Sequence, residues 1–186
     1  MKFILGKKLG MTTIYEGNKA LNVTLVECAE NSVSLLRSEE KDGYKAVALE
    51  RSKTAKRKVV KEFRIEEDSD LKKGDKVEVS IFEIGDKVKM SGTAKAKGFQ
   101  GVVKRHGFKG SPASHGHKHD LRAPGSIGAG FPEHVIKGKR MAGRMGGKRA
   151  TGKNIEIVYI DKEKNVLGFK GAVPGIPGNI VEIVSL

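Results

Sequence analysis

The sequence contains no tryptophan, only one cysteine and few aromatic residues, which make up 5% of its 186 positions. A single cysteine excludes an internal disulfide and any zinc site built from several thiolates. Cys28 lies in the apolar run LNVTLVECA, so we expect it to be a small buried core residue. No apolar run approaches the roughly 18 residues of a membrane helix, and the patch in MKFILGKKLG is too short for a signal peptide. We therefore expect a cytoplasmic protein that does not enter a membrane.

Acidic residues are nearly absent from the stretch 91–152, which we call the basic stretch. Its 62 residues include 13 lysines and arginines but only Asp120 and Glu133, so they carry +11 of the formal net charge of +14. All five histidines and 14 of the 24 glycines also lie there. The other 124 residues hold 23 basic and 20 acidic groups, an ordinary balance. This distribution indicates a polyanionic partner, which we expect to be nucleic acid.

The basic stretch also has few large apolar side chains with which to build a core. Ordering so many glycine-rich backbone units costs more entropy than burial of these few side chains returns. We therefore expect the stretch to take its shape from the partner that it binds. The apolar residues are Phe99, Val102, Val103, Phe108, Leu121, Ile127, Phe131, Val135, Ile136, Met141 and Met145.

Outside the basic stretch, apolar residues alternate with polar ones, and this period is typical of β-strands. Turn signals separate the alternating segments at 16–18, 41–43, 73–75 and 85–86. We predict a mainly β fold: a small closed antiparallel barrel from residues 1–90 and 153–186, with the basic stretch inserted between strands as a long, mostly irregular extension. The predicted strands are centred on Phe3 to Leu5, Leu21 to Leu25, Val33 to Leu35, Val47 to Leu49, Val77 to Ile81, Val88 to Met90, Ile155 to Tyr159, Val166 to Phe169 and Ile180 to Val184.

Within the basic stretch, only residues 97–106 have a helical pattern. Phe99, Val102 and Val103 would share one face of this short helix, and Gly107 would end it. Beyond it, the glycines and prolines favour looped or extended backbone.

A second basic run, RSKTAKRKVVKEFR at 51–64, interrupts the strand pattern. It is consistent with a solvated loop whose charge is balanced by the acids at 66–68 and 70. A second nucleic-acid contact is an equally good interpretation, and the sequence leaves both open.

Alternating histidines at His115, His117 and His119 suggest a metal site, because imidazole binds zinc, copper and iron. Lysines and arginines crowd this cluster, however, and Asp120 is the one carboxylate close to it in sequence. We therefore expect the rings to donate to phosphates or to stack on bases, and we expect no metal and no cofactor.

Glycines and cations alternate from Gly138 to Arg149, in a pattern that suggests a phosphate loop. The spacing excludes a Walker loop, because Ala142 and Arg149 stand where glycine and a hydroxyl residue are required. Glycine would still let backbone N–H groups approach phosphates that the cations neutralise. Met141 and Met145 could lie against a base or pack on the protein itself. The predicted RNA-binding residues are Lys95, Lys97, Lys104, Arg105, His106, Lys109, His115, His117, Lys118, His119, Arg122, Lys137, Lys139, Arg140, Arg144, Lys148 and Arg149.

No arrangement of serine, cysteine and histidine predicts a catalytic nucleophile, so we expect neither an enzyme nor a small-molecule substrate. A metal-dependent enzyme built on the three alternating histidines is one rival to this interpretation. The other is a free-standing protein that compacts nucleic acid without selecting its sequence.

Five blocks closely resemble the bacterial members of the family of large-subunit ribosomal protein three. The resemblance covers nearly the whole chain in the family's order, and it implies a six-stranded translation-protein barrel without enzymatic activity. It also implies a loop that passes through 23S ribosomal RNA toward the peptidyl transferase centre, an early role in subunit assembly, and neighbouring ribosomal proteins as partners. The blocks are GKKLGMT from Gly6, KGFQGVVKRHGF from Lys97, HGHKHDLRAPGSIGA from His115, KGKRMAGRMGGKR from Lys137 and GAVPGIPG from Gly171.

Carried over by position, the resemblance places the loop tip near 137–149 and the part between RNA helices at 95–122. Some members have a methylated glutamine where this chain has Arg144, so that modification is not expected here. The chain is also shorter than many bacterial relatives between Glu50 and Glu62, where they have an extra basic segment.

Overall fold

The computed structural model describes residues 2–29, 31–54, 57–66 and 70–186. Its contacts divide the chain into two compact units: Met1–Ala94 with Arg149–Leu186, which we call the body, and Lys95–Lys148, which we call the arm. The arm is shorter by a few residues at each end than the predicted extension 91–152, because residues at both ends of that stretch lie in paired strands of the body.

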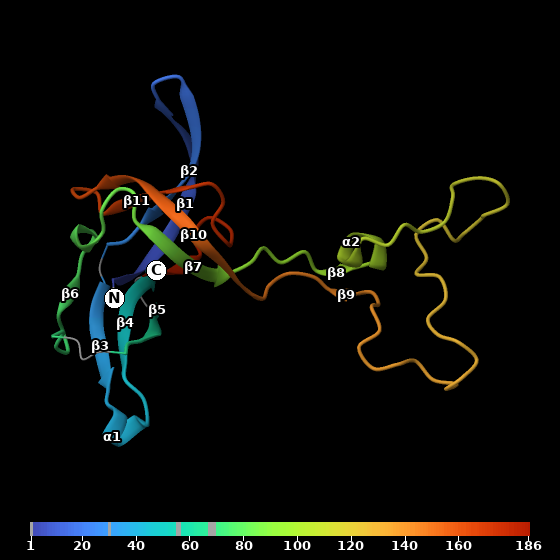
Figure 1. Cartoon of the computed structure of the whole chain (residues 1–186), viewed down its shortest axis with the longest axis horizontal. Coiled ribbons are helices and arrows are strands. Elements are labelled where there is room, and N and C mark those ends of the chain that lie inside the picture. Colours follow the sequence, from blue (N-terminus) through green and yellow to red (C-terminus); the bar gives the residue numbers. More distant parts are fainter. Residues whose placement is uncertain (1, 30, 55–56, 67–69) are drawn as a thin grey trace. The chain divides into compact units, whose positions relative to one another are not determined.

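Six strands of the body form a closed antiparallel ring (Figure 1). Each strand pairs with two neighbours, so the ring has no free edge, and the predicted mainly β fold is confirmed. In order around the ring, the strands are β1 (Phe3–Glu16), β12 (Ile180–Ser185), β7 (Lys87–Thr93), β10 (Arg149–Asp161), β11 (Val166–Lys170) and β2 (Lys19–Glu27).

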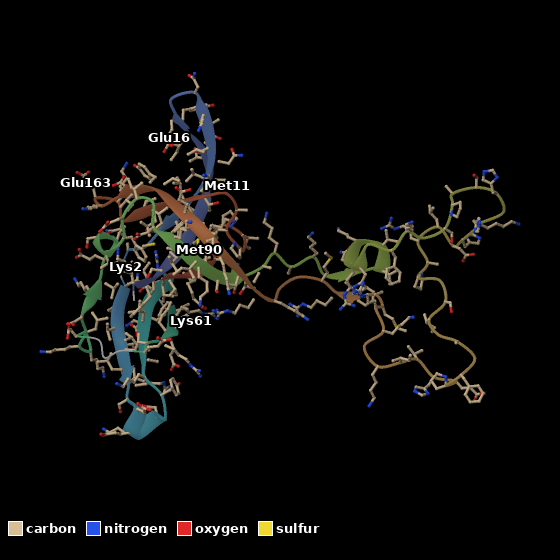
Figure 2. The ribbon with its side chains drawn as sticks, viewed as in Figure 1. Lys2, Met11, Glu16, Lys61, Met90 and Glu163 are labelled. Carbon is tan, nitrogen blue, oxygen red and sulfur yellow. The ribbon has the colours of Figure 1, made fainter. Side chains whose placement is uncertain are left out.

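Alternate residues of the ring strands fill its interior, as the period of two predicted. Met90, Ile157, Leu167 and Ile183 are completely buried there. Figure 2 shows Met90 within the ring, whereas Met11 lies farther out on the hairpin of β1 and β2. The core is therefore built mainly from aliphatic side chains, together with phenylalanines such as Phe169.

Four further strands form a separate sheet in the body. The prediction of a single barrel from residues 1–90 and 153–186 did not include this second sheet. Their order is β5 (Arg57–Arg64), β4 (Ala46–Thr54), β3 (Asn31–Arg37) and β6 (Lys76–Val77). The predicted strand 77–81 is wrong beyond Val77, because a 3-10 turn, η1 (Val79–Ile81), follows it. Alternation marks a strand but does not name its partner, and the sequence therefore could not separate the two sheets.

Two buried polar side chains, Asn31 and Arg51, connect the ring to the four-stranded sheet. The Asn31 amide accepts from the N–H of Leu5 at 3.1 Å and donates to the carbonyl of Leu5 at 2.9 Å and of Cys28 at 2.8 Å. Arg51 donates to the Leu5 carbonyl at 3.2 Å and pairs with the Glu27 carboxylate at 3.3 Å. On one side, Leu5 pairs with β12. On the other side, the Asn31 amide bonds the N–H and the carbonyl of Leu5, as the backbone of a neighbouring strand would.

The second basic run, 51–64, lies in β4 and β5 rather than in the solvated loop that one interpretation proposed; residues 55 and 56 lie outside the described part. Three of its cations, Arg51 among them, have acidic partners within the body. Lys58 pairs with Glu50 at 2.5 Å and Lys61 pairs with Glu182 at 3.5 Å. Glu50 lies in β4 and Glu182 lies in β12. Two of the acids that were predicted to balance the run, at 67 and 68, lie outside the described residues. The body thus offsets part of this run's charge.

The helices are short. Helix α1 (Glu39–Asp42) joins β3 to β4 and ends at Gly43, whose φ of 74° is the left-handed conformation that glycine adopts easily. Helix α2 (Val102–His106) lies in the arm. Within the described residues, no helix combines the length and the apolar character needed to cross a membrane.

Candidate nucleic-acid interface

The arm leaves and re-enters the body at adjacent positions, since Thr93 at the end of β7 is the register partner of Arg149 at the start of β10. Arg149 is held at this junction by the Glu182 carboxylate, whose oxygens accept from both terminal nitrogens of its guanidinium. Glu182 is on β12 and also pairs with Lys61. Arg149, a predicted RNA-binding residue, therefore pairs with an acid of the body at the start of β10.

A short two-stranded stem joins the two limbs of the arm. Strands β8 (Phe99–Gln100) and β9 (Gly143–Arg144) are antiparallel, with Phe99 opposite Arg144. Between these strands and the two ends of the arm, the N–H of Lys97 donates to the Met145 carbonyl and the N–H of Met145 donates to the Gly98 carbonyl, both at 2.9 Å. Of the predicted tip 137–149, only residues 137–142 therefore lie beyond the stem.

Helix α2 is shorter than the predicted helix 97–106. It begins after Gly101 and ends at Gly107, as predicted, but Phe99 lies in β8 and is 76% exposed instead of sharing a helical face. Gly98 has a φ of 67° and Gly101 is extended, and these two conformations interrupt the helix that the apolar spacing favours.

Two predicted RNA-binding residues on α2 contact the returning limb of the arm. The Arg105 guanidinium donates to the Met141 carbonyl at 2.6 Å, and the His106 ring contacts the same oxygen at 3.1 Å. A Cβ at Gly143 would lie 2.6 Å from Arg105 Nη1, so glycine lets this guanidinium lie close against the chain. Figure 1 shows α2 beside the stem, with open loops beyond.

Gly146 is the tightest position of the stem, and we expect Gly146→Ala to loosen it. Its φ is 74°, which costs an alanine about 1–2 kcal/mol, and an added methyl group would collide with the backbone carbonyl of Lys95. Amide exchange at Lys97 and Met145 in the full-length protein should accelerate. Gly138→Ala is the matched control, because its φ of 82° imposes a similar strain while nothing lies within 4 Å. Equal acceleration in both variants would contradict this role for Gly146.

The arm has almost no apolar core of its own. Of its large apolar side chains, only Val102 is buried, at 3% exposure. Phe99, Phe131 and Ile136 are 76%, 89% and 64% exposed. Local turns and the stem, rather than side-chain packing, define its backbone.

All the lysines and arginines of the arm except Arg105 are exposed, and none has an acidic partner. No ion pair involves residues 95–148, all of which are described, and the arm's acids are only Asp120 and Glu133. Such a surface repels itself and attracts a polyanion. The predicted RNA-binding residues that lie exposed on it are Lys95, Lys97, Lys104, Lys109, His115, His117, Lys118, His119, Arg122, Lys137, Lys139, Arg140, Arg144 and Lys148.

The alternating histidines lie in a loop whose ends meet where the N–H of Ser111 donates to the Leu121 carbonyl at 3.2 Å. His115 and Gly116 both have positive φ values, 61° and 87°, so the backbone turns within the cluster instead of running extended. The rings are exposed, and no metal-binding group of three His, Cys, Asp or Glu side chains occurs in the described ranges.

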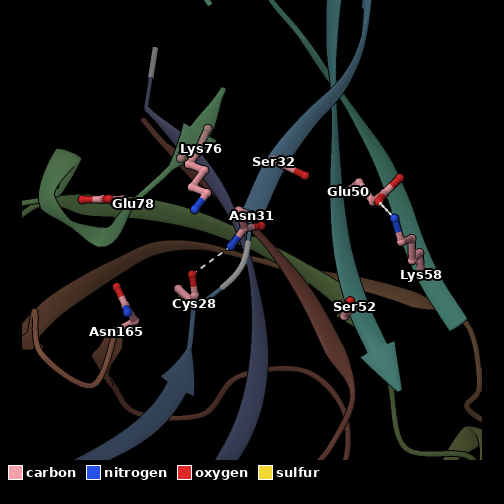
Figure 3. Close-up of a pocket in the computed structure, with 10 residues that line it drawn as sticks. Cys28, Asn31, Ser32, Glu50, Ser52, Lys58, Lys76, Glu78 and Asn165 are labelled. Atoms are coloured by element: carbon pink, nitrogen blue, oxygen red, sulfur yellow. Dashed lines mark hydrogen bonds and ion pairs between the residues drawn. The ribbon is translucent and has the colours of Figure 1, made fainter. Parts of the chain in front are cut away.

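The body has a polar cleft of about 400 Å³ between the ring and the four-stranded sheet (Figure 3). Its lining contains two lysines and two glutamates, and Lys58 pairs there with Glu50. Burial raises the pKa of the Cys28 thiol to about 12, although nearby Arg51 lowers it, so the thiol stays protonated and unreactive at neutral pH. The cleft therefore offers neither an activated nucleophile nor excess positive charge. Its lining is Cys28, Asn31, Ser32, Glu50, Ser52, Lys58, Lys76, Val77, Glu78 and Asn165.

The sequence matches the family model described as "Ribosomal protein L3" over residues 36–172. It is 47% identical to the large ribosomal subunit protein uL3 of Renibacterium salmoninarum, over 97% of this chain and 91% of the relative. It is 42% identical to the protein of that name from Chloroherpeton thalassium, over 100% of this chain and 99% of the relative. The identity to the Alkaliphilus metalliredigens protein of that name is 40%, over 94% of this chain and 92% of the relative.

Proposed function

The chain belongs to the ribosomal protein L3 family of non-enzymatic large-subunit proteins, and we propose that it binds large-subunit (23S) ribosomal RNA directly through its arm. One observation carries the proposal: the exposed cations of residues 95–148 have no acidic partners, and the arm has no core that would order it alone. Both properties fit a segment that is surrounded by RNA phosphates.

The body and the arm would have different roles in RNA binding. The ring, which we assign to the translation-protein type of barrel, would position the arm by holding its two ends together at Thr93 and Arg149. The exposed cations would offset the phosphate repulsion where RNA helices crowd together, and recognition of shape needs no base-edge contact. Arg105 and His106 would act as positioning residues, because the Met141 carbonyl already occupies them.

The family resemblance supports a finer assignment of the arm. We assign residues 95–122 to the part that lies between RNA helices and residues 137–142 to the part that approaches the peptidyl transferase centre. A protein that bridges RNA helices in this way would support early assembly of the subunit. The protein would be ribosome-bound in the cytoplasm, with neighbouring large-subunit proteins as further partners.

Amide exchange of the full-length protein tests the proposal. Free protein should exchange rapidly over Ala113 to Gly147, apart from the stem residues Gly143 to Met145, because the rest of this region has few backbone hydrogen bonds and no core. Addition of transcribed large-subunit RNA should protect these amides, while the strands of the ring should be protected in both samples. A generic RNA duplex at the same concentration is the control, and equal protection by it would favour a non-selective compacting protein. Strong protection of the whole region without RNA would contradict the proposal.

A further inference from the structure

The middle of the arm, residues 123–136, contains no lysine or arginine, although cations adjoin both of its ends. It reads APGSIGAGFPEHVI, and Glu133 is its one carboxylate. Arg122 precedes it directly and Lys137 follows it directly. We call residues 123–136 the cation-free segment. Attraction to phosphate, which accounts for the rest of the arm, does not account for this part.

The apolar side chains of the cation-free segment face solvent. Phe131 is 89% exposed, more than any other large apolar side chain in the described residues, and Ile136 and Ile127 are 64% and 43% exposed. The arm offers them no cover, since Val102 is its one buried large apolar residue. Several exposed apolar side chains in one short segment indicate a contact surface.

Local turns alone hold the backbone of the cation-free segment. The Ser126 hydroxyl donates to the Gly128 carbonyl at 2.8 Å, and the His134 ring bonds through Nδ1 to the Pro132 carbonyl at 2.9 Å. Because a carbonyl oxygen only accepts, Nδ1 is the donor in this hydrogen bond, and Nε2 is left without a partner inside the segment. The segment can therefore adapt to a surface that offers flat apolar faces and amino donors.

Nucleobases fit these properties better than phosphates do. Phosphates need cations, and Glu133 would repel them. Unpaired bases offer π faces that stack on aromatic side chains and edges that carry amino groups. Because the cation-free segment connects two cationic limbs that would both lie on RNA, its surroundings in the bound protein would be RNA too.

We propose that the cation-free segment contacts unpaired bases of large-subunit RNA, with Phe131 as the residue that stacks on a base. This inference rests on the proposed function, because the cations must first hold the arm on RNA. The cations bind any RNA backbone, whereas the cation-free segment selects places where bases are unstacked, such as loops and bulges. The arm would thus combine an unselective attraction with a local structural preference.

A tryptophan reporter tests the stacking contact directly. The chain has no tryptophan, so Phe131→Trp places a single fluorophore at an exposed position that no core depends on. In the full-length variant, addition of transcribed large-subunit RNA should quench its emission and shield it from acrylamide. Tyr15→Trp is the matched control, because Tyr15 is 75% exposed on the β1–β2 hairpin of the body. Quenching and shielding no greater than in this control would overturn the proposal.

Phe131→Ala supplies a second measurement. We expect it to weaken binding to the same RNA by roughly 5- to 150-fold, the effect of losing one stacked base, with an unchanged dependence on salt because no charge is lost. Phe131→Tyr should bind like the parent protein. Unchanged affinity of Phe131→Ala would overturn the proposal, and if that variant also failed to enter subunits, the segment would be assigned to a protein neighbour. Failure of the parent protein to bind RNA would instead reject the proposed function.

Discussion

Replacing Lys139, Arg140 and Arg144 together with glutamine is expected to weaken binding to large-subunit RNA by roughly 100- to 500-fold at about 0.1 M salt. Each phosphate that a cation neutralises contributes about 0.7 to 0.9 to the slope of log affinity against log salt, so three lost contacts lower that slope by about two to three. The three side chains are exposed and form no ion pair in the arm, so the fold should not change. Binding measured at several salt concentrations gives both quantities.

A matched control removes the same charge from the body. Lys19, Lys41 and Lys162 are exposed lysines of the body, and their replacement by glutamine lowers the net charge equally. If long-range attraction by net charge were the whole effect, both triple variants would lose the same slope. An unchanged slope in the arm variant would show that these three side chains do not contact phosphate.

Asn31→Ala is expected to lower the free energy of unfolding of the protein by about 3 kcal/mol. The side chain is 2% exposed and makes three short hydrogen bonds to Leu5 and Cys28. Each buried hydrogen bond contributes about 1 kcal/mol, and a buried group left without its partner costs about 1–3 kcal/mol. The Leu5 carbonyl would keep its bond from Arg51, whereas the Leu5 N–H would lose the amide that serves as its strand partner.

Denaturant unfolding of the full-length variants measures this effect. Ser32→Ala is the control, because Ser32 is the next residue of β3, is half-buried and lines the cleft without bonding the ring. It should change the free energy of unfolding by less than about 0.5 kcal/mol. A similarly small change for Asn31→Ala would mean that the ring and the four-stranded sheet do not depend on this amide.

The strands and their core were predictable because alternation of apolar and polar residues reports burial directly. Val88 and Met90, for example, alternate with lysine and serine neighbours and are completely buried. Division of the strands between two sheets was not predictable, since β3 and β4 have the same period as the ring strands. The role of Asn31 was also not predictable from the sequence, because a buried amide that replaces a strand partner has no characteristic spacing from other residues.

The cationic surface of the arm was visible in the composition, but the separate roles of individual cations were not. Arg105 and Arg149 belong to the same basic stretch as Lys139, yet the first bonds the Met141 carbonyl and the second bonds Glu182. These partners are 36 and 33 residues away in sequence, and only the folded chain brings them together. Charge counting therefore marks a candidate interface without distinguishing cations that are exposed from cations that bond the protein itself.

Lys8 is a further residue whose role the sequence concealed. It stands in the block GKKLGMT, and its ammonium group donates to the carbonyls of Val173 and Gly175 at 2.8 and 3.1 Å. The N–H of Gly178 donates in turn to the Lys8 carbonyl at 2.7 Å. The first and last of the five sequence blocks therefore bond to each other within the body. This contact is made by the protein alone, without RNA.

The pairing of Thr93 with Arg149 makes the whole arm, in topological terms, an oversized hairpin loop between β7 and β10. Enlarging such a loop from four residues to roughly fifty adds only about 2 kcal/mol of closure entropy. Insertions or deletions beyond the stem therefore leave the strand register of the ring unchanged. We therefore expect that the arm can be lengthened or shortened without altering the ring that holds its two ends.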